Sequence, residues 1–250
     1  MTRPIRIGLL AEGETELGAS IPYVKPEDGG KIIDRTHEGA LHTLIRRELN
    51  AAGFSDCEFI QRHPTIREQG KGKIRSGYSI LESKYLRQIV TVWKPHEIDM
   101  IILVVDADDI LEARHQKLKD ALKIIQNEHL DRDGNEVDDR SLTGLAIRDF
   151  ETWLIADTNT LSKKFNLQIS PIENPESLTE TKSILNDTIE QSDYLSHENN
   201  INQRRLEVRW AIAKQLNLET LKTQCPQGYG QFAETLITTS KTTATYIDRL

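Results

Sequence analysis

The sequence predicts an α/β protein built on an open, mainly parallel sheet. The two apolar runs IRIGLL at residues 5–10 and DMIILVV at residues 99–105 are typical of buried strands. The second is almost wholly apolar, as expected for a central parallel strand covered on both faces. Strands alternate with helical patterns up to about residue 150, and this alternation favours a parallel sheet flanked by helices.

The first quarter of the chain begins with the strand at residues 5–10, which ends in the turn AEGETE. Residues 20–35 carry two prolines and a glycine pair, so we expect a loop or an insertion there. Apolar residues at helical spacing predict a helix over residues 38–52, which Gly53 ends. A short strand is expected at residues 57–61.

The polar, glycine-rich and basic segment at residues 63–77 predicts an exposed loop, and residues 131–139 an acidic turn. A further strand is expected at residues 142–147. Helices are predicted at residues 78–92, 111–129 and 149–156.

Beyond residue 157 the pattern contains no convincing strand. Helical segments are expected at residues 178–189, 204–216 and 230–237, joined by connections rich in Asn, Pro and Ser. The sequence therefore predicts an α/β domain over residues 1–157 and a helical extension over residues 158–250. We expect the extension to pack on the domain as part of one structural unit.

Composition limits the classes of function. The net charge of −7 argues against tight, non-specific DNA binding through overall charge, although a local basic track is compatible with it. The two cysteines, Cys57 and Cys225, lie far apart and lack the spacing of a zinc site. No signal peptide or apolar run of about 20 residues is evident, so we expect a cytoplasmic protein without a membrane span.

Acidic residues stand at three predicted strand ends. Glu12 and Glu16 follow the first strand, and Asp149 and Glu151 follow the strand at residues 142–147. After the apolar strand come the three residues Asp106, Asp108 and Asp109. Ligands of open α/β sheets bind outside the carboxyl ends of the strands, so neighbouring strands would bring these acids together.

Clustered carboxylates repel one another, and a fold keeps them by protonating some or by binding a cation. Oxygen ligands without nearby His or Cys favour Mg²⁺ or Mn²⁺ over zinc. Taken singly, each acidic group has a simpler explanation as a helix cap or first-turn residue. The occurrence of all three groups at strand ends favours the metal site.

The motifs also resemble a known fold. A first strand ending in EGxxE and a later apolar strand ending in DxD resemble the Toprim domain of primases, topoisomerases and OLD-type nucleases. The segments AIRDFETWLIAD, ENPESL and CPQGYGQFAETL are similar to an uncharacterised family of small, stand-alone Toprim-like bacterial proteins. The likeness spans nearly the whole chain and implies a Toprim-like α/β domain with Mg²⁺-dependent cleavage of phosphodiesters.

The resemblance also implies roles for individual acids. Glu12 matches the first Toprim acid, which acts in metal binding or general acid–base catalysis, and Glu16 matches the second acid of EGxxE. Asp106 and Asp108 match the metal-binding DxD pair. Glu151 could correspond to a third-strand acid, although its surrounding residues differ. The candidate metal ligands are therefore Glu12, Glu16, Asp106, Asp108, Asp109 and Glu151.

Two partners follow from the same comparison. The basic loop carries Arg67, Lys71, Lys73 and Arg75, which could lie along the phosphate backbone of a nucleic acid, or could be an ordinary solvated loop. OLD nucleases also carry an ATPase domain, which we do not expect within this chain. The resemblance therefore implies a separate ATPase partner, as in an anti-phage defence system.

Two other functions remain open from the sequence. VVDADDI resembles the strand-end motif of HAD-type phosphatases, in which the first Asp is the nucleophile. Ile110 departs from that motif, and the EGETE turn would then have no role. The fold could also be a non-catalytic interaction module that regulates a partner ATPase.

Overall fold

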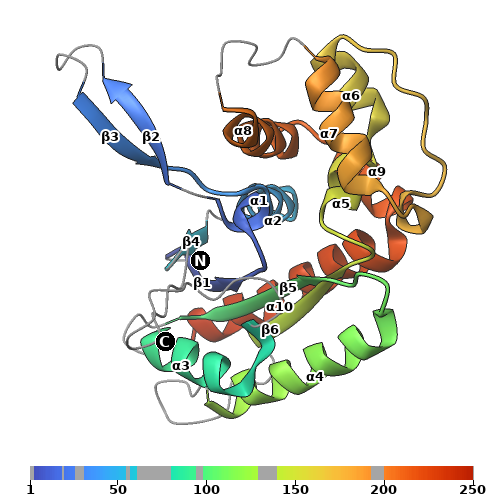
Figure 1. Ribbon diagram of the computed structural model, residues 1–250. Helices are drawn as coiled ribbons and strands as arrows, with labels where there is room; N and C mark the ends of the chain where they lie inside the picture. Colours follow the sequence, from blue (N-terminus) through green and yellow to red (C-terminus); the bar gives the residue numbers. More distant parts are fainter. Residues whose placement is uncertain are drawn as a thin grey trace.

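The computed structural model (Figure 1) describes residues 3–18, 20–25, 31–54, 57–60, 80–93, 98–128, 140–192 and 200–249. The predicted loop at residues 63–77 and the predicted acidic turn at residues 131–139 lie outside the described residues.

The central sheet has four parallel strands in the order β4-β1-β5-β6. These are β1 (Ile5–Leu10), β4 (Cys57–Phe59), β5 (Met100–Asp106) and β6 (Ser141–Ala146). The chain passes from β1 to β4 on one side and then crosses to β5 on the other. This reversal lies between β1 and β5, the point at which open α/β sheets bind their ligands. The predicted fold class is confirmed, since helices flank this parallel sheet and further helices follow it.

Strand β5 is buried along its whole length. Met100, Ile102 and Val104 belong to the hydrophobic core on one face of the sheet. Ile101 and Leu103, one residue out of phase, belong to the core on the other face. Alternation of this kind follows from the two-residue period of a strand, and burial on both faces explains why the run is apolar throughout.

Two pairs of helices cover the sheet (Figure 1). Helices α3 (Ser83–Trp93) and α4 (Leu111–Glu128) contact each other and form the smaller core. On the opposite face lie α2 (Ala40–Ala51) and α10 (Gln231–Ile247), which belong to the larger core. The last helix of the chain thus completes the α/β domain.

Residues 20–35 were predicted to be a loop or an insertion, and the loop alternative is wrong. They form most of an antiparallel hairpin of β2 (Ser20–Lys25) and β3 (Lys31–Thr36). Pro22 pairs in register with Asp34. A ribbon of two strands consists of edges alone, and edge strands tolerate proline, so the proline signal was misleading there.

After α5 (Glu151–Ile155), the helical extension contains α6 (Thr158–Phe165), α7 (Thr181–Gln191), α8 (Ile201–Ala213) and α9 (Leu218–Gln224). A 3₁₀ turn at Pro175–Ser177 and a π turn at Pro226–Gly230 connect them. Helices α7, α8 and α10 were predicted, whereas α6 and α9 were missed. Both missed helices are short and begin at capping residues, Asp157 and Asn217, which as sequence resemble a polar connection.

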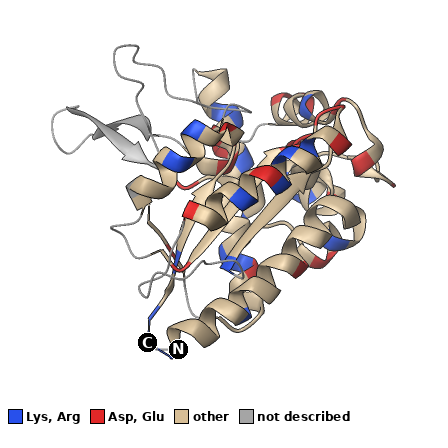
Figure 2. Ribbon diagram, turned by 90° about the horizontal axis from the view of Figure 1, so that it is seen from below, with Lys and Arg blue, Asp and Glu red and all other residues tan. Residues whose placement is uncertain are grey.

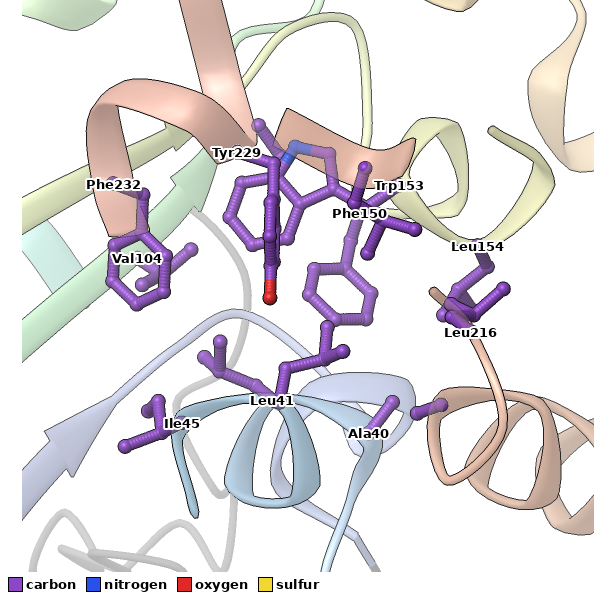
Figure 3. Packing of buried hydrophobic residues seen from close by; sticks show 14 of the residues in the cluster. Ala40, Leu41, Ile45, Val104, Phe150, Trp153, Leu154, Leu216, Tyr229 and Phe232 are labelled. Atoms are coloured by element: carbon purple, nitrogen blue, oxygen red, sulfur yellow. The ribbon is translucent and has the colours of Figure 1, made fainter. Parts of the chain in front are cut away.

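An aromatic cluster joins the extension to the sheet (Figure 3). Trp153 packs against the rings of Tyr229 and Phe232, with centroids 5.2 Å and 5.6 Å away, and against Phe150 at 5.1 Å. These four rings come from the segments AIRDFETWLIAD and CPQGYGQFAETL. Packing therefore explains the aromatic residues of both segments.

A buried polar group reinforces this attachment. The Tyr229 hydroxyl donates to Glu48 Oε1 at 2.9 Å, and Lys222 Nζ lies 3.0 Å from Glu48 Oε2. Figure 3 shows the Tyr229 oxygen directed toward α2, which carries Glu48. Arg47 on the same helix donates to the carbonyls of Ala213 and Leu216 at 2.7 Å and 2.6 Å. Helix α2 is thus bound to the extension through charged hydrogen bonds.

We predict that Tyr229→Phe lowers the free energy of unfolding by about 1–3 kcal/mol, because a buried carboxylate loses one of its donors. Denaturant unfolding would measure the change. Tyr246→Phe is the matched control, since Tyr246 meets Arg140 through its ring at 3.5 Å. Equal stability of the two variants would contradict the role assigned to the Tyr229 hydroxyl.

Candidate functional site

The first acidic motif is held by a close backbone crossing. Glu16 lies in the short helix α1 (Glu14–Leu17), which ends at Gly18 with φ of 81°. A Cβ on Gly18 would lie 1.9 Å from the His37 carbonyl oxygen, and one on Gly39 would lie 2.1 Å from the Glu16 carbonyl oxygen. Only glycine allows the two segments to approach this closely. The crossing fixes Glu16 in a buried position.

The first and second motifs meet at the reversal of the sheet. Glu12 Oε1 accepts a hydrogen bond from the backbone N–H of Asp106 at 3.0 Å. Glu12 follows β1 and Asp106 ends β5, so this bond links the carboxyl ends of two neighbouring strands.

The third motif reaches the same place from β6 and α5. Asp149 Oδ1 accepts hydrogen bonds from the Thr152 N–H at 3.2 Å and from Thr181 Oγ1 at 2.6 Å. Glu151 is buried, and Arg209 Nε lies 3.4 Å from its Oε1. The structure thus brings together Glu12, Glu16, Asp106, Asp149 and Glu151, which we call the acidic cluster.

One lysine of the extension enters this cluster. Lys182 Nζ lies 3.5 Å from Asp106 Oδ2, 3.9 Å from Asp149 Oδ2 and 3.9 Å from Glu151 Oε2. Its side chain is 55% exposed, whereas that of Asp106 is 11% exposed. The ammonium therefore meets the buried carboxylates of Asp106 and Glu151, and the partly buried one of Asp149, from the solvent side.

Burial governs the protonation of the cluster. Loss of solvent, followed by the charge of Glu16, raises the pKa of Asp106 to about 9. Loss of solvent, followed by the charge of Glu151, raises the pKa of Glu16 to about 7. Burial also raises the pKa of Glu12 and of Glu151. The nearby cations thus do not balance the negative charge of the cluster. Some of its carboxyls therefore hold protons near neutral pH.

Asp108 and Asp109 are directed elsewhere. Arg114 forms an ion pair with Asp108, and Arg148 forms one with Asp109. The two Asp side chains are 52% and 78% exposed. Asp108 and Arg148 have φ of 48° and 69°, and the Asp108 N–H donates to the Arg148 carbonyl at 2.8 Å.

Residues other than glycine seldom adopt this left-handed conformation. At Asp108 and Arg148, just beyond the ends of β5 and β6, this conformation turns the side chains of Asp108 and Asp109 outward. Of the predicted DxD pair, the structure therefore brings Asp106 into the cluster and pairs Asp108 with Arg114 beside it.

The predicted basic residues Arg67, Lys71, Lys73 and Arg75 lie outside the described residues. Over the described helices, Figure 2 shows acidic and basic residues interspersed.

The donor atoms of the cluster are all carboxylate oxygens, which suit a hard divalent cation such as Mg²⁺ or Mn²⁺. Within the described residues, no three or more His, Cys, Asp or Glu side chains are grouped closely enough to hold a metal ion as they stand. Three of the carboxylates surround the Lys182 ammonium instead. The chemistry of the donors thus fits a metal, while their present spacing fits an ammonium.

Sequence reasoning missed the two cations of the site. Lys182 and Arg209 lie on α7 and α8, and a single Lys or Arg on a helix carries no recognisable motif. The nearby ENPESL segment has a structural explanation. Glu176 accepts hydrogen bonds from the backbone N–H groups of Gln227 and Gly228 at 3.2 Å and 2.6 Å.

The fold and site define an α/β protein with a buried acidic cluster at the carboxyl edge of a parallel sheet. The model of the family described as "Domain of unknown function (DUF4276)" matches residues 34–236, and the chain belongs to this family. The matched region includes Asp106, Glu151 and Lys182, and begins beyond Glu12 and Glu16. Comparison with curated proteins and with solved structures finds no significant match. In the described part of the chain, no helix is long and apolar enough to cross a membrane.

The raised pKa values predict that stability falls as pH rises. Between the usual pKa of 3.8 for Asp106 and its value of about 9, the folded protein holds a proton that the unfolded chain has lost. The same holds for Glu16 between 4.5 and about 7. We expect a slope of up to about 1.4 kcal/mol per pH unit for each such proton.

Thermal unfolding of the metal-free protein from pH 5 to pH 9 would measure this slope. Asp106→Asn mimics the protonated acid, so it should raise the melting temperature at pH 8 and flatten the profile. Asp108→Asn should leave the slope unchanged, because that side chain is exposed. A wild-type stability that rises over this interval would contradict the protonation assigned to the cluster.

Proposed function

We propose that the protein cleaves phosphodiester bonds of nucleic acid in a reaction that depends on Mg²⁺ or Mn²⁺. One observation carries this proposal: buried carboxylates from β1, β5 and the segment after β6 converge at the reversal of the sheet and lack balancing positive charge. This is the edge at which open α/β sheets bind ligands.

Asp106, Glu12 and Glu151 are the residues we assign to the metal. A divalent cation bound there would polarise the phosphate and lower the pKa of a bound water. Arg209 holds the Glu151 carboxylate in place. Glu16, with a pKa of about 7, is suited to accept a proton from the attacking water, because catalytic bases work best near the operating pH.

The resemblance of AEGETE and VVDADD to Toprim motifs supports the same chemistry, as does the relation to OLD-type nucleases that it implies. The proposal includes a nucleic-acid substrate, a separate ATPase partner and a role in anti-phage defence. Cleavage would use Asp106 of the DxD pair directly, and Asp108 only after release from Arg114.

A non-catalytic interaction module is the second candidate, and the Lys182 contacts favour it. An ammonium that already meets three carboxylates could keep the fold intact without metal. The phosphatase alternative has less support, because Asp108, the second acid of its motif, is half exposed and paired with Arg114.

We predict that Asp106→Asn lowers metal-dependent cleavage on the order of a hundredfold or more. Plasmid, single-stranded DNA and RNA would be assayed with Mg²⁺, Mn²⁺ and a chelator, with and without a candidate ATPase. Asp108→Asn is the matched control and should retain most activity. Biological activity that survives both Asp106→Asn and Glu12→Gln would favour the interaction module instead.

Metal binding should release protons, because carboxyls must be ionised to act as ligands. Because the pKa of Asp106 is raised to about 9 and burial also raises the pKa of Glu12 and of Glu151, we expect Mg²⁺ affinity to rise from pH 6 to pH 9. Calorimetry at pH 7 in buffers of different ionisation enthalpy would count the protons released. A binding enthalpy independent of the buffer would remove Asp106 from the ligand set.

A further inference from the structure

We draw no further inference here: the strongest candidate, the two-stranded β2–β3 ribbon whose central pairs Tyr23–Ile33 and Val24–Ile32 are apolar, is separate from the central sheet, and nothing in the described part of the chain shows what covers it.

Discussion

Buried negative charge at the carboxyl edge of the sheet is the constraint on which the rest of the structure depends. The reversal of strand order between β1 and β5 places Glu12 against Asp106, and α5 adds Glu151. Removal of these groups from water is the largest cause of their raised pKa values. Such a cluster persists only if the fold supplies cations, protons or a metal.

The helical extension meets this need. Lys182 and Arg209 both come from it and both contact the cluster. The same extension is bound to α2 through Glu48 and Tyr229, and its own segments are joined by Glu176. The α/β part and the extension therefore depend on each other electrostatically as well as through packing, and loss of the extension would leave the acids without these cations.

Sequence patterns predicted the features that follow from local periodicity and from the geometry of parallel sheets. The apolar run at β5 and the acids at three strand ends were enough to place Asp106 and Glu151 at one edge of a sheet. They were not enough to find Lys182, which lies 76 positions (182 − 106) along the chain, because its position depends on how α7 packs. The outward turn of Asp108 could not be predicted either, since it depends on a left-handed backbone that residues other than Gly seldom adopt.

The two acids of the DxD motif therefore differ in burial and in their charged partners, which a sequence motif does not reveal. Asp106 is buried and has a pKa raised to about 9, whereas Asp108 is half exposed and already paired with Arg114. At both positions the present partner is a cation of the same chain. Asp108 would first have to leave its ion pair with Arg114, whereas Asp106 already lies among the other carboxylates of the cluster. This difference is why Asp106 and not Asp108 is central to the proposed chemistry.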